Sequence, residues 1–237
     1  MTFSQTIKLI PRMVKYNLKV IFAGKFIWFL LAALGFFGFF MFQVAWNRAE
    51  INEALIYDLL IFPSVLLIFY PTVFGIQNDE DSRILEILFG IPDYRYKVWG
   101  VRLLMIYAAV FFILTVFSFL ATILMYPVNP FGMAAQLMLP TLFYGNLAFM
   151  FSTITRSGNG TAVILIIISI LLLIFSDEDF MRNTFWNIML NPYELPRYVL
   201  PVIWENTIIK SRIFLFAGSM VWLMAGLLNL QKREKFV

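Results

Sequence analysis

Long uninterrupted apolar runs dominate the hydropathy pattern of the chain. Stretches without any charged residue occupy residues 26–46, 59–78, 103–155, 157–176 and 213–231. An α-helix needs about 20 predominantly apolar residues to cross a bilayer, and each stretch is long enough. The runs are continuous rather than alternating, which predicts membrane-spanning helices and not a β-barrel.

The third run is too long for one crossing, and a turn signal divides it. The sequence YPVNP at 126–130 combines two prolines with an asparagine, which ends one helix and starts a turn. The pattern therefore predicts an all-α membrane protein whose residues 1–237 form a single transmembrane domain. Its six predicted spans cover approximately residues 26–46, 57–76, 103–125, 132–155, 160–176 and 212–230.

The composition agrees with a membrane protein and narrows the chemistry. Hydrophobic residues make up 61% of the chain and charged residues 14%, whereas soluble domains are about 25% charged. The absence of Cys and His excludes disulfides, thiolate or imidazole metal ligands and histidine catalysis. The chain has no metalloprotease or serine-hydrolase motif and no paired carboxylates inside a predicted span, which disfavours an intramembrane enzyme.

The distribution of Lys and Arg predicts the orientation of the spans. If the N-terminus is cytoplasmic, thirteen Lys and Arg fall in inner segments and five in outer segments. Positive charge marks the cytoplasmic side. We therefore expect a multi-pass protein of the inner (plasma) membrane with both termini in the cytoplasm.

The segment before the first span has the pattern of a basic amphipathic helix. Basic residues recur at helical spacing on one face and aliphatic residues on another, which predicts a helix within 1–25 that lies in the membrane interface. The basic residues are Lys8, Arg12, Lys15 and Lys19. This helix could be a plain anchor that fixes the topology, or a lever between a cytoplasmic partner and the first span.

A densely charged segment, residues 77–102, interrupts the apolar pattern between the second and third spans. It contains five acidic and four basic residues. Within it, aliphatic residues from Ile84 to Ile91 form a stripe with polar neighbours, and Pro92 ends the helical pattern. We interpret 79–92 as a short amphipathic helix at the cytoplasmic surface, with Tyr96 and Trp99 in an interfacial belt and Arg102 reaching toward the headgroups.

This segment resembles the first cytoplasmic loop of ABC-2 type transporter permeases. The carrying motif is LEILFGIP at 85–92, preceded by an acidic run and followed by Arg95 and Arg102. Glu86 matches the loop glutamate of that family, Pro92 its proline, and Arg102 stands in the place of its lysine. Arg83 and Ile84 stand where the family usually has Gly-Thr. The resemblance extends to the amphipathic N-terminal segment, the six spans and the basic C-terminal tail.

The resemblance implies a coupling helix at 79–92 that docks on an ATPase. The residues expected to take part are Asp79, Glu80, Asp81, Arg83, Leu85, Glu86, Leu88, Pro92 and Arg95. The implied partners are two ATP-binding cassette ATPase subunits, a second permease chain, identical or different, and membrane lipids, with no nucleic acid. The chain contains no G-x-x-x-x-G-K-[ST] phosphate loop. We therefore expect ATP and magnesium to bind the partner ATPase, and this chain to bind no cofactor or metal and to have no catalytic residue.

Polar residues inside the fourth span invite two interpretations. Asn146 and its polar neighbours could hydrogen-bond between helices, which we favour, or contact a ligand. In the family that the chain resembles, spans two and five line the transport path. The candidate path residues here are Phe62, Phe69, Tyr70, Phe74 and Asn146. Such a mostly apolar wall favours an amphipathic or lipid-like cargo.

The segment 177–211 before the last span is long, aromatic and rich in proline. By resemblance it would fold back into the outer interface as re-entrant helices that cap the path; the alternative is a simple amphipathic loop. Three function classes follow from the whole chain. The leading one is a transport subunit, the second is a membrane scaffold or regulatory subunit that docks an ATPase without moving cargo, and the third is the disfavoured enzyme.

Overall fold

The architecture is all-helical, as the hydropathy pattern predicts. The computed structural model describes residues 25–47, 50–81, 95–177, 181 and 183–230. Every regular element within these residues is a helix, and six helices are long and apolar enough to cross a membrane. The prediction of an all-α protein with six candidate spans is therefore confirmed.

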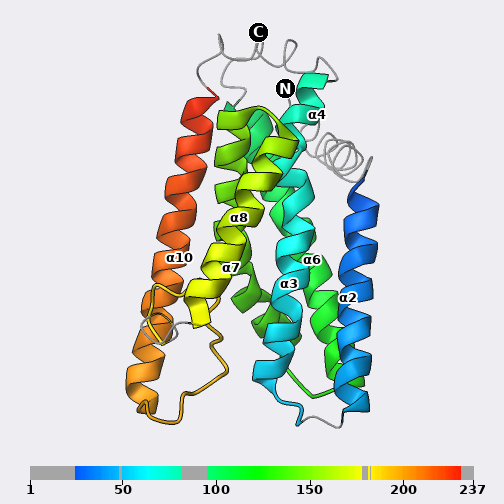
Figure 1. Cartoon of the computed structure of the whole chain (residues 1–237), viewed down its shortest axis with the longest axis vertical. Coiled ribbons are helices and arrows are strands. Elements are labelled where there is room, and N and C mark those ends of the chain that lie inside the picture. The colour runs from blue at the N-terminus through cyan, green and yellow to red at the C-terminus, as the bar shows by residue number, and fades with distance from the viewer. Residues whose placement is uncertain (1–24, 48–49, 82–94, 178–180, 182, 231–237) are drawn as a thin grey trace, which may run out of the picture.

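The helices follow one another along the chain, with the longest connection between α8 and α10 (Figure 1). They are α2 (Phe26–Trp46), α3 (Glu53–Val73), α4 (Gly75–Asp81), the π-helix η1 (Arg95–Gly100), α6 (Val101–Leu124), α7 (Pro130–Thr155), α8 (Gly158–Asp177) and α10 (Pro201–Asn229). A bend at Phe74 separates α3 from α4, and η1 runs directly into α6. The charged segment thus begins within α4, includes η1 and ends in the first turn of α6.

Local sequence signals set several helix ends. Asn52 caps α3, since its side chain accepts a hydrogen bond from the backbone N–H of Leu55 at 2.8 Å. Asn129 caps α7 in the same way and Pro130 occupies the first helical position. The turn predicted at YPVNP is therefore present, and it ends α6 and begins α7.

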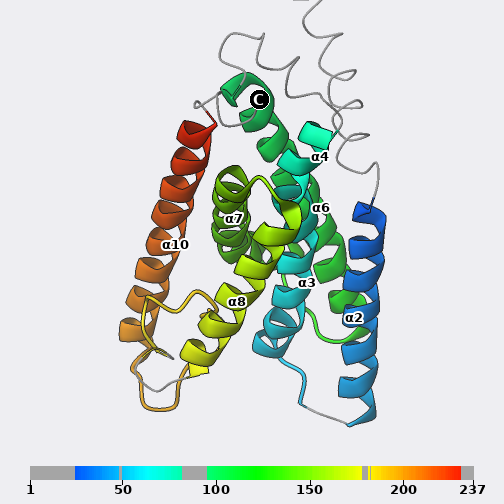
Figure 2. The same cartoon turned by 45° about the horizontal axis from the view of Figure 1, so that its top comes forward.

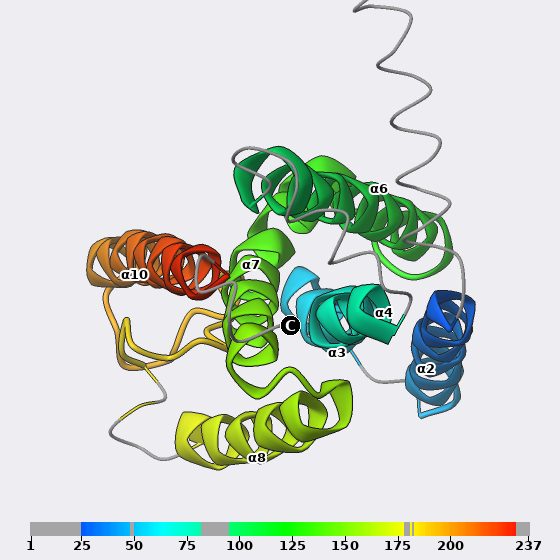
Figure 3. The same cartoon turned by 90° about the horizontal axis from the view of Figure 1, so that it is seen from above.

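The six long helices run alternately up and down, with α7 at the centre (Figures 1 and 3). Seen from above, α3, α6, α8 and α10 surround α7, while α2 lies outside α3 (Figure 3). The start of α2, the end of α10, α4 and η1 lie at one end of the bundle, which we call the α4 end (Figure 1). The segment 183–200 lies at the opposite end (Figure 2).

Small residues let neighbouring helices approach α7 closely. A Cβ added to Gly145 would lie 2.7 Å from Ile68 of α3 and 2.8 Å from the Tyr107 hydroxyl of α6. Gly218 and Gly226 of α10 would meet aromatic rings of α7 at equally short distances. In lipid, where hydrophobic burial does not drive helices together, such close packing is a main source of association.

The last helix begins earlier than the sequence predicts. We expect the sixth span at 212–230, yet α10 starts at Pro201 and extends without a break to Asn229. Lys210 and Arg212 sit inside it, and their charges obscure the helix in a search for uncharged runs. At 29 residues the helix measures about 43 Å, longer than the roughly 30 Å hydrocarbon core.

Residues 183–200, which precede α10, fold back on the bundle without forming a helix. Residues 183–200 are turns, and the re-entrant helices suggested by the resemblance do not occur among them. Pro192 and Pro196 explain this, because each removes a backbone donor and restricts the residue before it. Side chains from this segment are nevertheless buried, including Ile188 and Leu190.

Part of the predicted machinery lies outside the described residues. This applies to the N-terminal segment with Lys8, Arg12, Lys15 and Lys19, and to the loop residues Arg83, Leu85, Glu86, Leu88 and Pro92. Glu80 and Arg95 are described only as backbone positions, in α4 and η1.

Alanine substitution at two glycines tests the close packing around α7. Gly145→Ala should lower thermal stability in detergent, because overpacking typically costs about 1–3 kcal/mol. Gly35→Ala is the matched control, since a Cβ there meets nothing within 4 Å, and it should be neutral or slightly stabilising. Equal unfolding temperatures for both variants would contradict this packing.

Candidate functional site

A buried ion pair joins α4 to α6, on either side of residues 82–94. Asp79 lies in α4, near its end, and Arg102 in the first turn of α6. The Arg102 Nη1 donates to the Asp79 Oδ2 at 2.6 Å, and the two residues are only 8% and 3% exposed. The pair therefore holds the two stems of the 82–94 segment together.

Trp99 completes this pair from the side of η1. The Arg102 guanidinium lies 4.5 Å from the centroid of the Trp99 indole, a cation–π arrangement. Trp99 is 1% exposed and packs against Phe149 of α7, with ring centroids 5.6 Å apart. Gly75, at the start of α4, lies against the same ring, where a Cβ would be 3.4 Å away.

These positions differ from the interfacial roles expected for Trp99 and Arg102. The expectation treats each as an isolated residue at a span end, where Trp lies among headgroups and Arg reaches toward water. Here the Arg102 guanidinium lies over the Trp99 ring inside the bundle, and Asp79 neutralises its charge. The Trp99 Nε1 and the Arg102 Nε are buried without a hydrogen-bond partner among the described residues. Only Tyr96, which is 45% exposed, has the exposure of an interfacial residue.

Separate hydrogen bonds near this pair join neighbouring helices at the α4 end. The Tyr70 hydroxyl accepts from the Lys25 backbone N–H at 3.3 Å and from the Asn78 side chain at 3.4 Å. The Ser152 hydroxyl of α7 donates to the Val73 carbonyl at 2.9 Å, and Gln77 accepts from the backbone N–H of Gly158 in α8. We call Asp79, Arg102, Trp99, Tyr70 and Asn78 the junction cluster, since it connects the α4 end of most helices.

The placement of Asp79 bears on its predicted role. The resemblance assigns Asp79 and Asp81 to an acidic docking run. Asp79 instead points into the bundle and is neutralised by Arg102, whereas Asp81 is exposed at the end of α4. This geometry suits Asp79 to holding the stems of the segment rather than to touching a partner directly.

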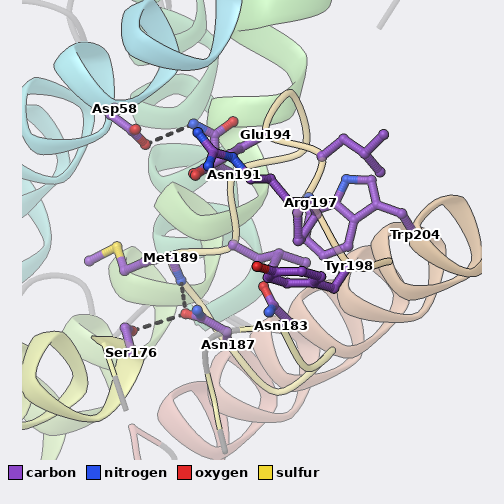
Figure 4. Close-up of a pocket in the computed structure, with 13 residues that line it drawn as sticks. Asp58, Ser176, Asn183, Asn187, Met189, Asn191, Glu194, Arg197, Tyr198 and Trp204 are labelled. Carbon is purple, nitrogen blue, oxygen red and sulfur yellow. Dashed lines mark hydrogen bonds between the residues drawn. The ribbon is translucent and has the colours of Figure 1, made fainter. Parts of the chain in front are cut away.

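A polar pocket lies at the opposite end of the bundle, where α3, α8, α10 and the 183–200 segment meet (Figure 4). Its volume is about 760 Å³. The lining residues are Asp58, Ser176, Asn183, Asn187, Met189, Leu190, Asn191, Glu194, Leu195, Pro196, Arg197, Tyr198 and Trp204. We call this the end pocket.

Asparagines of the 183–200 segment fix the shape of the end pocket. The Asn191 side chain donates to the Asp58 carboxylate at 2.9 Å and to the Ala54 carbonyl at 2.8 Å. The Asn187 side-chain oxygen accepts from the Ser176 hydroxyl of α8 at 2.9 Å. Both asparagines are buried, and their part-buried hydrogen bonds attach the segment to α3 and α8.

Arg212 of α10 also holds the 183–200 segment in place through hydrogen bonds. Its Nε donates to Gln136 of α7 at 2.9 Å, and its Nη2 donates to the Leu190 carbonyl at 3.4 Å. Tyr193 packs over Tyr57, with ring centroids 5.9 Å apart. Burial, together with the nearby Glu53 carboxylate, raises the pKa of the Tyr193 phenol, which therefore stays neutral.

The candidate path residues do not converge on one cavity. Phe62 is 50% exposed and contacts Phe36 of α2, whereas Phe69, Tyr70 and Phe74 form an aromatic group nearer the α4 end. Phe69 also lines a gap between α3, α7 and α8 of about 10 Å³, room for roughly one water molecule.

Asn146 performs the structural role favoured by the sequence. Its side-chain oxygen accepts from the Tyr107 hydroxyl at 2.6 Å, and its nitrogen donates to the Ser219 hydroxyl at 2.7 Å and the Ser219 carbonyl at 3.2 Å. Asn146 is 1% exposed, and these bonds join α7 to α6 and α10. The interpretation as a helix–helix hydrogen bond is confirmed.

Comparison of the chain with protein-family models, curated proteins and solved structures finds no match. Across the part of the chain that the structure describes, no group of three Asp, Glu, His or Cys side chains could hold a metal ion. The two sites therefore rest on their own geometry: an ion-paired junction at the α4 end and a polar pocket at the other.

A double-mutant cycle tests the ion pair. Arg102→Met should destabilise the protein by about 3–5 kcal/mol, because it leaves the Asp79 carboxylate buried without a counter-charge. Asp79→Leu should destabilise the protein by a similar amount, because it leaves the Arg102 guanidinium buried without a counter-charge. The double variant should lose much less than the two single losses added together, as measured by unfolding in denaturant. Additive losses would mean that the two side chains do not interact.

Proposed function

We propose that this chain is the membrane-spanning permease subunit of an ABC-2 type ATP-driven exporter. The observation that carries the proposal is the mounting of the charged segment, whose motif resembles the coupling loop of that family. The Asp79–Arg102 pair joins α4, at one end of residues 82–94, to the first turn of α6, which continues from η1 at the other end. A docking segment mounted on such a base would pass force from a cytoplasmic partner to α3 and α6 together.

In this proposal, α3 transmits that force to the end pocket. Asp79 in α4 belongs to the junction cluster, and Asp58 in α3 lines the end pocket. The 21 helical steps from Asp58 to Asp79 correspond to about 31 Å of helix, the thickness of a hydrocarbon core. A displacement of the α4 end would therefore reach the end pocket through a single continuous rod, with one bend at Phe74.

The energy source in this proposal is separate from the chain. Two ATP-binding cassette subunits would dock at the α4 end and would bind and hydrolyse ATP with magnesium. The chain would lie in the inner membrane, with its α4 end facing the cytoplasm. The distribution of Lys and Arg supports that orientation. Glu86 and the exposed Asp81 would meet the ATPase, while Asp79 would position them.

The cargo in this proposal is amphipathic or lipid-like. The aromatic and aliphatic surfaces of α3 and α8 suit apolar chains, and the end pocket offers polar partners where a headgroup would emerge. A second permease chain, identical or different, would supply the other wall of the path, because the gap inside one chain near Phe69 is only about 10 Å³.

Charge reversal in the loop tests the docking. Glu86→Arg should release the ATPase from the complex, or uncouple ATP hydrolysis from transport, while the permease still inserts; truncating one partner of a desolvated charge pair costs about 2–5 kcal/mol. The assay is co-purification of the ATPase together with cargo-stimulated hydrolysis. Glu205→Arg, an exposed carboxylate at the opposite end, is the matched control and should behave as wild type.

Two outcomes of that assay would argue against the proposal. If Glu86→Arg leaves both co-purification and coupled hydrolysis at the wild-type level, the segment is not the docking element. If the ATPase binds normally but no candidate cargo ever stimulates it, the chain is better described as a scaffold that docks an ATPase without moving cargo.

The assembly state is a separate prediction. Mass measurement of the complex in mild detergent should give two permease chains for each pair of ATPase subunits, because one six-helix unit has no second wall. A fully active particle with a single permease chain would contradict the proposed path.

A further inference from the structure

We propose that the end pocket binds a zwitterionic phospholipid headgroup, one that carries an ammonium group and a phosphate. This inference deepens the proposed function by naming a class of cargo, and it rests on that function in treating the pocket as the receiving end of a path. Binding itself needs no ATPase, so the site can be tested on this chain alone.

Two carboxylates supply the ammonium side of the pocket. Asp58 projects from α3 and Glu194 from the 183–200 segment, and both line the pocket (Figure 4). Neither carboxylate forms an ion pair with another residue in the described part of the chain. A cation between them would relieve their mutual repulsion.

Aromatic side chains indicate that this cation is organic. Trp204 lines the pocket although it is only 5% exposed, and its indole extends from α10 toward the part of the segment that carries Tyr198 (Figure 4). Aromatic faces attract ammonium groups. The Trp204 Nε1 is itself buried and has no hydrogen-bond partner among the described residues.

Arg197 supplies the phosphate side. Its guanidinium lines the same pocket and forms no ion pair with Asp58 or Glu194. A guanidinium donates two parallel hydrogen bonds to a phosphate. The pocket thus offers carboxylates for a positive group and Arg197 for a negative one, which matches a zwitterion better than a simple cation or anion.

The position of the pocket favours a lipid over a free solute. It lies where α3 begins and α8 ends, the depth at which headgroups lie if these helices span a bilayer. Exposed apolar side chains flank it on both sides, Ile174 and Phe175 of α8 and Val202 and Ile203 of α10. Acyl chains could lie on these surfaces while the headgroup fills part of the 760 Å³ volume.

Native mass spectrometry of the full chain in detergent tests the site. Phosphatidylethanolamine should bind more tightly than phosphatidylglycerol with the same acyl chains, since only the former carries an ammonium. Glu194→Gln should weaken phosphatidylethanolamine binding about tenfold and leave phosphatidylglycerol binding unchanged or tighter. Glu205→Gln, an exposed carboxylate of α10 that does not line the pocket, is the control and should change neither.

Two further measurements complete the test. Arg197→Gln should weaken both lipids by a similar factor, because it removes the phosphate contact that they share. Free phosphoethanolamine should fail to displace the lipid at matched concentrations; displacement would make a soluble zwitterion the ligand and overturn the lipid assignment. Equal binding of the two lipids to the wild type, or no effect of Glu194→Gln, would overturn the proposal.

The outcomes separate this inference from the proposed function. Loss of lipid selectivity on Glu194→Gln, with no ATPase bound under any condition, would support the headgroup site and count against the exporter. An ATPase that docks and couples through Glu86, with no lipid selectivity in the end pocket, would support the exporter and count against the headgroup site.

Discussion

The buried pair between Asp79 and Arg102 is the contact on which the α4 end of the bundle depends. Two charges withdrawn from water are unfavourable unless they compensate each other, so each residue requires the other. The pair holds the end of α4 against the start of α6, with the Arg102 Nη1 2.6 Å from the Asp79 Oδ2. The guanidinium also lies over the Trp99 ring. The two described ends of the charged segment are thereby held to the bundle by a buried contact.

The interior of the bundle is organised around α7, and polar contacts hold it as much as apolar packing does. Asn146 bonds to Tyr107 and Ser219, and Ser152 bonds to the Val73 carbonyl. In an apolar medium, an unsatisfied polar group is costly, so these bonds select one arrangement of α3, α6, α7 and α10. The helices at the periphery, α2 and α8, are the least buried and are the faces available to lipid or to a second chain.

Apolar run length and turn chemistry were sufficient to predict the six helices, because a bilayer demands long uncharged stretches and YPVNP cannot continue a helix. The start of α10 could not be predicted in this way. Lys210 and Arg212 break the apolar run, and the Arg212 hydrogen bonds to Gln136 and Leu190 exist only in the folded state. The junction cluster could not be predicted either, because its contacts also exist only in the folded state. Asp79 and Arg102 are 23 residues apart, and each in isolation has the pattern of a surface charge. The asparagines that shape the end pocket carry a weak signal, an Asn-Pro step at 191–192, which indicates a turn but not its partners.

The two sites lie at opposite ends of one nearly continuous helix, and in the proposed exporter that helix would connect ATP hydrolysis to cargo. The most direct test asks what touches the charged segment in the membrane. The chain has no cysteine, so Ser82→Cys introduces a single site for a photoactivatable thiol reagent, and Asn206→Cys, exposed at the opposite end, is its control. In membranes of cells that produce the chain from its own genomic context, we expect cross-links from position 82 to an ATP-binding subunit and none from position 206. Cross-links from position 82 to lipid alone, or to the ATPase from position 206 instead, would contradict the account.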